Sequence, residues 1–184
     1  MEGIIRTRVG YSGGEMLYPT YRNMGDHSET IQIDYDPDRI SYRELLNIFW
    51  KSHNPTRRAW RRQYMSAIFY HNETQKKLAL ETMAQEEKQR GQKIHTEILP
   101  SVKFYLAEDY HQKYQLQNHR ELMTEFKTMF PRTIDFINST AAARVNGYVS
   151  GQGTLEEVKA NLENLGLSAG ANKRLLEIAA RWSK

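Results

Sequence analysis

The chain has 184 residues, a formal net charge of +4 and a mean hydropathy of -0.74, which exclude a protein built mainly from membrane-spanning segments. Hydrophobic residues make up 39% of the chain and charged residues 26%, the proportions of an ordinary folded domain. No residue is a cysteine, which excludes a disulfide, a cysteine metal site and a thiolate nucleophile within these residues.

The N-terminus and the charge pattern predict location and partners. The run Met1-Glu2-Gly3-Ile4 lacks the basic and then apolar pattern of a signal peptide, so we expect an intracellular, cytoplasmic protein with no membrane partner. Basic residues are spread along the chain, apart from Arg57-Arg58 and Arg61-Arg62 around Trp60. We therefore expect no nucleic-acid partner, because such partners call for a concentrated basic surface.

The first part of the chain predicts strands separated by a long loop and a helix. Ile31, Ile33 and Tyr35 alternate with polar residues, which is typical of a strand with one buried face. Ser41 and Glu44 form a capping-box pattern that begins a helix. The expected elements are a strand over Ile4 to Gly10, a loop over Tyr11 to Asp26, a strand over Glu29 to Tyr35, a helix from Ser41 to Asn54, and a third strand over Tyr64 to Tyr70.

A long helix and short extended pieces follow. Asn72 is a good N-cap, and Gly91 favours a helix end after about Arg90. His95 to Leu99 and Val102 to Leu106 are predicted as short extended pieces, and Asp109 opens a helical stretch.

The composition changes near Pro131. Residues 132 to 153 are rich in Ala and Gly and are predicted to be a connection. Thr154 to Glu157 is a second capping box; Gly166 ends that helix and Ser168 begins the last one. We expect one domain over 1–130 and a C-terminal extension with a helical hairpin over 131–184.

Tyr21, Glu29 and Tyr64 form a candidate site, because two predicted strand starts and the adjoining loop can meet at one end of a sheet. Two phenol O–H groups and one carboxylic acid would surround a polar oxygen. Burial among aromatic rings would disfavour the charged carboxylate and allow it to act as a general acid. The alternative is ordinary: tyrosines that pack and a solvated glutamate.

Other candidate sites are weaker. The six histidines are scattered without paired ligand spacing, so we expect no metal. Residues from Asp109 to Tyr114 are predicted either to line a pocket rim or simply to start a helix.

Many short motifs resemble those of A-type peptide methionine sulfoxide reductases, in that family's order. They are Val9-Gly10-Tyr11-Ser12-Gly13-Gly14, Pro19-Thr20-Tyr21, His27-Ser28-Glu29, Tyr35-Asp36-Pro37, Ile40-Ser41-Tyr42, Phe49-Trp50, Gln63-Tyr64, Ser66-Ala67-Ile68, Thr96-Glu97-Ile98 and Ala107-Glu108-Asp109-Tyr110-His111-Gln112. The resemblance is continuous from about Gly3 to Tyr114. The segment from Asp135 to Gly151 resembles the C-terminal extension of some animal members.

The resemblance implies an α/β fold (an α+β two-layer sandwich) with a ferredoxin-like mixed sheet and helices on one side, plus a C-terminal helical extension. It implies reduction of the S-epimer of methionine sulfoxide in oxidised proteins, in protein repair under oxidative stress. A cysteine thiolate attacks the sulfoxide sulfur, and thiols, finally thioredoxin, are the external reductant without a bound cofactor. Glu29 matches the acid that protonates the sulfoxide oxygen, and Tyr21 and Tyr64 match the phenols that bind it. The substrate-pocket residues implied are Tyr11, His27, Trp60, Asp109 and His111.

Two features depart from the family pattern. Its Gly-Cys-Phe-Trp motif does not occur here, and we expect that motif, a first strand and a first helix to precede Gly3, so that the chain is a truncated member and inactive as it stands. The alternative is a non-catalytic methionine-sulfoxide-binding or regulatory module. The loop from Pro55 to Gln63 is also short, and Trp60 in it is expected to pack in the interior rather than close over the pocket.

Overall fold

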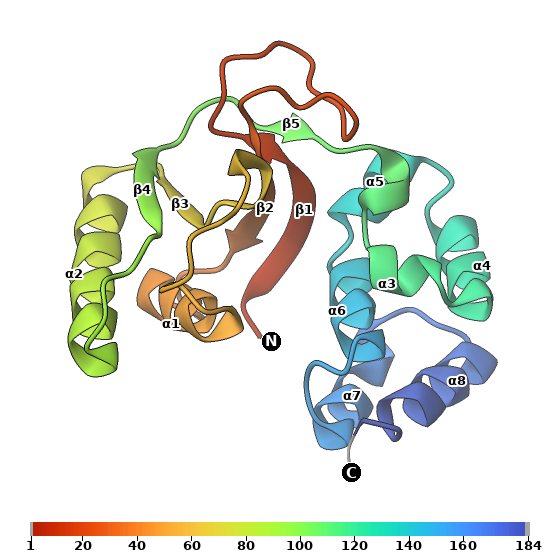
Figure 1. Ribbon diagram of the computed structural model, residues 1–184. Helices are drawn as coiled ribbons and strands as arrows, with labels where there is room; N and C mark the ends of the chain where they lie inside the picture. The colour runs from red at the N-terminus through yellow and green to blue at the C-terminus, as the bar shows by residue number, and fades with distance from the viewer. Residues whose placement is uncertain (1, 183–184) are drawn as a thin grey trace. The chain divides into compact units, whose positions relative to one another are not determined.

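The computed structural model describes residues 2–182 (Figure 1). The strands are β1 (Ile4–Ser12), β2 (Ser28–Tyr35), β3 (Ala67–Tyr70), β4 (Glu97–Pro100) and β5 (Tyr105–Leu106). The α-helices are α1 (Tyr42–Ser52), α2 (Glu73–Arg90), α3 (Tyr114–Gln117), α4 (Arg120–Met129), α5 (Thr133–Asn138), α6 (Thr140–Val149), α7 (Leu155–Asn161) and α8 (Ala169–Ala179). Short 3-10 turns are η1 (Arg62–Tyr64), η2 (Asp109–His111) and η3 (Leu162–Asn164).

The strands form two small sheets. One has the order β2-β1-β5, with Gly10 opposite Leu106 in an antiparallel pair; the other joins β3 and β4 in parallel, with Ala67 opposite Glu97. The predicted α/β class is therefore confirmed. The strands are divided between two sheets rather than one mixed sheet, because no strand among residues 2–182 pairs with both groups.

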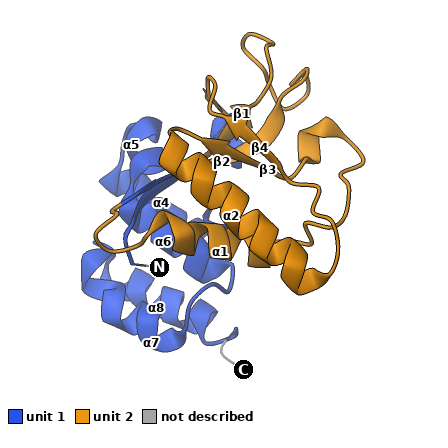
Figure 2. Ribbon diagram, turned by 90° about the vertical axis from the view of Figure 1, so that its left-hand side faces the viewer, with its two compact units in different colours: residues 1–8, 32–35, 108–184 blue, residues 9–31, 36–107 orange. Residues whose placement is uncertain are grey.

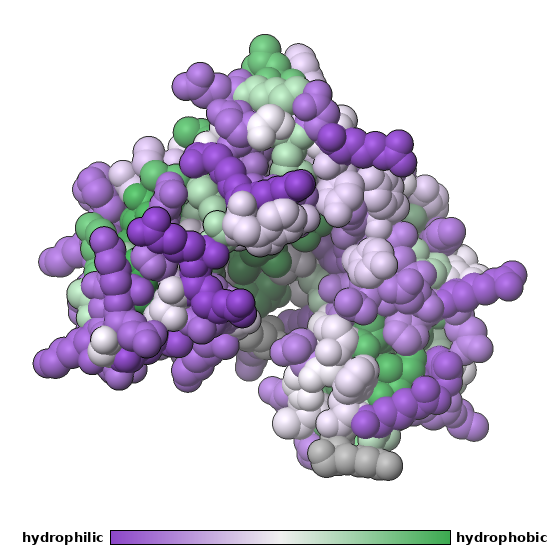
Figure 3. Space-filling view, viewed as in Figure 1, coloured by the Kyte–Doolittle hydropathy of each residue, from purple (hydrophilic) through white to green (hydrophobic). Residues whose placement is uncertain are grey.

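The chain divides into two compact units, coloured separately in Figure 2. We call residues 9–31 and 36–107 the α/β unit, and residues 2–8, 32–35 and 108–182 the helical unit. Hydrophilic residues predominate on the face that Figure 3 shows, with smaller apolar areas scattered among the hydrophilic ones. The boundary predicted at residues 130 and 131 stays a prediction.

Helix ends follow the local sequence closely. The predicted capping boxes at Ser41 and Thr154 are both formed, each with its partner glutamate three residues later. Asn72 caps α2 by accepting from the N–H of Gln75, and Gly91 ends that helix in the left-handed conformation with φ 61°. Ser168 caps α8. These predictions are confirmed. Each cap depends on groups within four residues of one another, so the local sequence is enough to predict it.

The core of the α/β unit lies between α1, α2 and β3. Its buried members are Leu46, Trp50, Ile68, Ala79 and Ile94. The indole N–H of Trp50 donates to the hydroxyl of Thr82 at 3.0 Å, so the one polar group of this side chain is satisfied inside the core.

The core of the helical unit is built from α3 to α8, and here one prediction is wrong. Residues 132 to 153 are not a connection, since they form α5 and α6. Ser139 caps α6 by accepting from the N–H of Ala142, and Ile137, Val145 and Tyr148 are buried in the core. The Ala and Gly content that suggested a connection instead gives α6 a slender profile for close packing.

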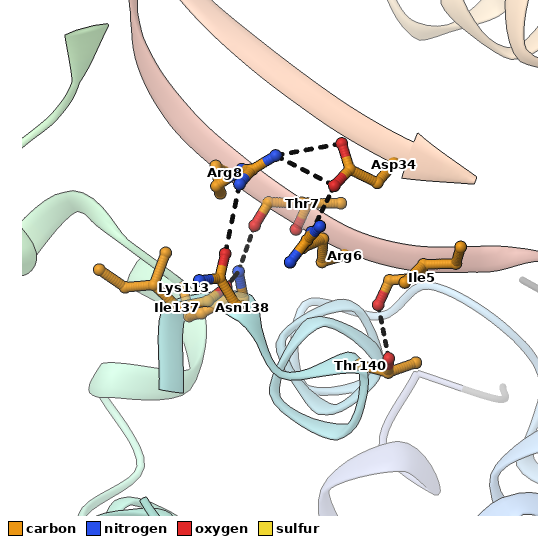
Figure 4. A network of polar contacts seen from close by, with 9 residues as sticks. All are labelled: Ile5, Arg6, Thr7, Arg8, Asp34, Lys113, Ile137, Asn138 and Thr140. Atoms are coloured by element: carbon orange, nitrogen blue, oxygen red, sulfur yellow. Dashed lines mark hydrogen bonds and ion pairs between the residues drawn. The ribbon is translucent and has the colours of Figure 1, made fainter. Parts of the chain in front are cut away.

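A network of polar contacts around the buried Lys113 holds the helical unit together (Figure 4). The ammonium of Lys113 donates to the backbone carbonyl oxygens of Thr7 and, at 2.9 Å, of Ile137. Arg8 donates to the carboxylate of Asp34 at 3.0 Å. The hydroxyl of Thr140 donates to the carbonyl oxygen of Ile5 at 2.6 Å. The network joins residues more than a hundred positions apart in the sequence.

None of the helices within residues 2–182 is long and apolar enough to cross a membrane.

Candidate functional site

Two of the predicted site residues, Tyr21 and His27, lie on the loop that joins β1 to β2, drawn in red above β1 in Figure 1. His27 at its end is fully buried and holds the loop from both ring nitrogens. The N–H of Gly14 donates to Nδ1 at 3.2 Å, so the ring proton lies on Nε2, which donates to the carbonyl oxygen of Met16 at 2.8 Å. His27 therefore supports the loop in this structure, and its predicted place in the pocket stays a prediction.

Asp26 and Arg62 hold the same loop from its outer side. The Asp26 carboxylate accepts from the backbone N–H groups of Glu15 and Met16, at 2.9 and 3.2 Å, and these bonds lower the pKa of Asp26. Arg62 donates to the carbonyl oxygens of Asp26 at 2.8 Å and Gly13 at 3.1 Å. A Cβ at Gly14 would lie 2.4 Å from Asp26 Oδ1, so this turn requires glycine.

Glu29, Gln63, Tyr64 and Trp60 come together where β2 begins. The amide of Gln63 donates to Glu29 Oε1 at 2.7 Å, and the hydroxyl of Ser28 donates to the carbonyl oxygen of Arg62 at 2.8 Å. These two bonds fix η1 against the start of β2. The rings of Trp60 and Tyr64 lie 5.5 Å apart. Tyr64 follows Gln63 in η1, and both Tyr64 and Glu29 are exposed, so a carboxyl group, an amide and a phenol are available near the start of β2 to bind a polar oxygen.

The two remaining tyrosines differ in burial. Tyr21 is exposed, next to the backbone bridge between Thr20 and Asn23. Tyr11 is 2% exposed and packs with Met24 and Ala107, so in this structure it belongs to a small core cluster.

Three expectations about local structure are wrong. Tyr64 does not begin a strand, because it ends η1 and β3 starts only at Ala67. Trp60 does not pack in the interior: its side chain is 72% exposed, with the guanidinium of Arg61 4.5 Å from its ring centroid. Glu29 is exposed rather than enclosed among aromatic rings. The side-chain hydrogen bond described for its carboxylate comes from the amide of Gln63.

Asp109 and His111 lie in η2, in the helical unit, and their place at a pocket rim stays a prediction. Within residues 2–182 no group of three or more His, Cys, Asp or Glu side chains could hold a metal ion.

The sequence did not predict that Gln63 binds Glu29, or that Asp26 and Arg62 hold the loop between β1 and β2 in place. Gln63 was noticed only as a neighbour of Tyr64, and no spacing rule connects it to Glu29, 34 residues away. Asp26 did carry a signal, because an aspartate beside a glycine commonly accepts backbone N–H bonds in a turn.

Comparisons with known proteins agree on one family. The model of the family described as peptide methionine sulfoxide reductase matches residues 1–142. A peptide methionine sulfoxide reductase of Drosophila melanogaster is 44% identical over 168 residues, 90% of this chain and 67% of that protein. Peptide methionine sulfoxide reductase A5 of Oryza sativa is 37% identical over 156 residues, 82% of this chain and 61% of that protein.

Solved structures of the same kind are also similar. Methionine sulfoxide reductase A of Corynebacterium diphtheriae matches with a TM-score of 0.56 and 32% identity, over 64% of this chain and 65% of that one. Mxr1 from Saccharomyces cerevisiae in its reduced form matches with a TM-score of 0.59 and 30% identity, over 65% of this chain and 74% of that one. The chain thus spans 67% and 61% of the two reductases compared by sequence and 65% of the Corynebacterium diphtheriae enzyme.

Proposed function

The chain belongs to the peptide methionine sulfoxide reductase family, and from this premise we propose that it carries the sulfoxide-binding residues of a peptide-methionine (S)-S-oxide reductase. The observation that carries the proposal is the patch formed by Glu29, Gln63, Tyr64 and Trp60. Glu29 is the proposed general acid, and Tyr21 and Tyr64 are the proposed hydrogen-bond donors to the sulfoxide oxygen. Trp60 is the proposed contact for the substrate's apolar part. The proposed substrate is the S-epimer of methionine sulfoxide in oxidised proteins.

The proposed chemistry assigns each group a step. The acid gives a proton to the sulfoxide oxygen as a thiolate attacks the sulfur and an S–S bond forms. The S–O bond then breaks with loss of water, and a water molecule attacks the thiol sulfur and breaks the S–S bond, so that methionine leaves, reduced by two electrons, and the thiol is oxidised to a sulfenic acid. Two further thiols, from thioredoxin or a small dithiol, reduce the sulfenic acid with loss of water. We propose no bound cofactor and no membrane or nucleic-acid partner, and a cytoplasmic location stays a prediction. These 184 residues contain no cysteine, so the attacking thiolate is not among them.

We expect the 184-residue chain to show no reductase turnover. No other side chain replaces a soft thiolate that attacks sulfur, so dithiothreitol should not support release of methionine from a sulfoxide peptide above the rate without protein. Chromatographic measurement of reduced peptide checks this, with another member of the family as the positive control. Turnover above background would contradict the assigned chemistry.

We expect the chain to bind a methionine sulfoxide peptide although it does not reduce it, and we expect this binding to depend on Tyr64. We expect calorimetry to show a preference for an S-sulfoxide peptide over the same peptide with methionine. Tyr64→Phe removes one O–H donor and should weaken that binding by roughly fivefold, the effect of losing about 1 kcal/mol. Tyr114→Phe, at an exposed tyrosine of the helical unit, should leave it unchanged. Equal binding of sulfoxide and methionine peptides would refute the proposal.

A chimera separates the reductase from the alternative, a non-catalytic binding or regulatory module, which the zero cysteine count favours. Joining these residues to a family segment that contains Gly-Cys-Phe-Trp should restore turnover if the site is that of a reductase. A folded chimera that binds sulfoxide without turnover would favour the module.

A further inference from the structure

A group of unpaired arginines lies beside the proposed sulfoxide site. We call residues 57–62 the arginine loop. Arg57, Arg58 and Arg61 are exposed, and none of them forms an ion pair with a carboxylate among residues 2–182. On helices α1 and α2 of the same unit, by contrast, Arg43 pairs with Glu81 at 2.9 Å and Arg90 with Glu86 at 2.8 Å. The loop therefore concentrates positive charge that the fold itself does not neutralise.

The fourth arginine of the loop shows why this charge stays in place. Arg62 is committed to the carbonyl oxygens of Asp26 and Gly13, and its own carbonyl oxygen accepts from Ser28. The C-terminal end of the loop is thus tied to the start of β2, where Glu29 lies. Arg58 and Trp60 are two residues apart, so their Cα atoms can be separated by at most about 7 Å. The guanidinium of Arg61 lies 4.5 Å from the Trp60 ring centroid, and the Trp60 and Tyr64 ring centroids lie 5.5 Å apart, so charge of the loop lies next to these rings.

We infer that the arginine loop recognises acidic side chains next to the methionine sulfoxide of a polypeptide substrate, an inference that rests on the proposed function. Guanidinium groups match carboxylates in geometry as well as charge, and they bind them with paired hydrogen bonds. A peptide whose sulfoxide side chain lies at Glu29 and Tyr64 would run past Trp60, and its Asp and Glu residues would meet Arg57, Arg58 and Arg61.

The same surface favours an acidic peptide over a nucleic acid. Stable nucleic-acid binding draws on many phosphate contacts, and this loop offers three free arginines. The exposed carboxylate of Glu29 in the proposed site would repel phosphates bound next to it, whereas a peptide can place its acidic residues away from it. An exposed Trp60 could stack on a base, so an oligonucleotide is included in the test.

The test compares sulfoxide peptides that differ only in their flanking residues. One carries three Asp or Glu residues beside the sulfoxide, and the other carries Asn or Gln in their place. We expect the acidic peptide to bind about tenfold more tightly in calorimetry at low salt, since each exposed ion pair contributes up to about 1 kcal/mol. The difference should shrink as salt is added.

Two double variants with the same net charge test whether the preference for the acidic peptide comes from the arginine loop. Arg57→Gln/Arg58→Gln should abolish most of the preference and keep the affinity for the amide-flanked peptide. Lys88→Gln/Lys93→Gln, which removes the same charge from exposed positions of the same unit, should keep the preference. Both pairs are exposed, and thermal unfolding of each variant checks that the fold is retained.

Each other outcome overturns the inference in a distinct way. No acidic preference in the wild-type chain, or equal behaviour of the two variants, rules out recognition by the loop. An oligonucleotide that binds more tightly than the acidic peptide, and loses binding in the arginine variant, assigns the loop to nucleic acid. An acidic sulfoxide peptide and the same acidic peptide with methionine that bind with equal affinity refute the proposed function and leave only a site for acidic peptides.

Discussion

Trp50→Ala is expected to lower the free energy of unfolding of the α/β unit by about 3–5 kcal/mol. The side chain is fully buried between α1, α2 and β3, and its ring lies 4.9 Å from that of Phe49. Removing it leaves a cavity that rigid neighbours such as Ile68 can fill only in part. It also removes the donor to the buried hydroxyl of Thr82.

Trp60→Ala provides a matched control in the same unit. Its side chain is 72% exposed, so the same substitution should change the free energy of unfolding by less than about 0.5 kcal/mol. Urea denaturation followed by circular dichroism measures both variants. Similar losses at the two positions would mean that Trp60 is buried and that the surface assigned to it is wrong.

The sequence predicted those features of the fold that depend on neighbouring residues. Ser41 and Thr154 cap helices because a hydroxyl and a glutamate three residues on satisfy each other's backbone donors, whatever lies elsewhere. Residues 132 to 153 were misassigned because their helices are stabilised by burial of Ile137, Val145 and Tyr148 against α3, α4 and α8, which no local pattern reveals.

The sequence likewise predicted some features of the candidate site and not others. Glu29, Tyr21 and Tyr64 stood out by their residue types, and motif resemblance gave them roles that stay predictions. Gln63 could not be predicted, because its bond to Glu29 depends on how η1 meets β2. The exposure of Trp60 was missed since aromatic residues are usually buried, whereas here arginines flank it on the surface.

Raising the pH should stabilise the helical unit, because of Lys113. Burial, and next the nearby charge of Arg8, lower the pKa of Lys113 from 10.5 to about 8. Between these two values the unfolded chain keeps its proton while the folded chain has lost it, so the free energy of unfolding rises with pH. From pH 8 to 9.5 the gain is about 1.6 kcal/mol, because the full slope of about 1.36 kcal/mol per pH unit is reached only above the folded pKa.

The gain is specific to Lys113 in this pH window. His119 has a pKa lowered below 6.5, chiefly by burial, and Tyr148 has a pKa raised above 10.0, so both titrate outside it. Asp34 pairs with Arg6 and Arg8, and among residues 2–182 the hydrogen bonds described for the Lys113 ammonium go to the carbonyl oxygens of Thr7 and Ile137. A neutral amine can still donate to both oxygens, so deprotonation removes the cost of a buried charge without breaking the network.

Lys113→Met isolates this effect, because it keeps the length of the side chain and cannot be charged. Lys113 has φ 51°, a left-handed conformation that Met would share, so backbone strain cancels in the comparison. We expect the variant to lose the rise in stability between pH 8 and 9.5, measured by urea denaturation at each pH. Lys127→Met, at an exposed lysine of α4, should keep it. If the free energy of unfolding of the Lys113→Met variant rose with pH as steeply as that of the wild type, the buried ammonium of Lys113 would not be the source of the rise.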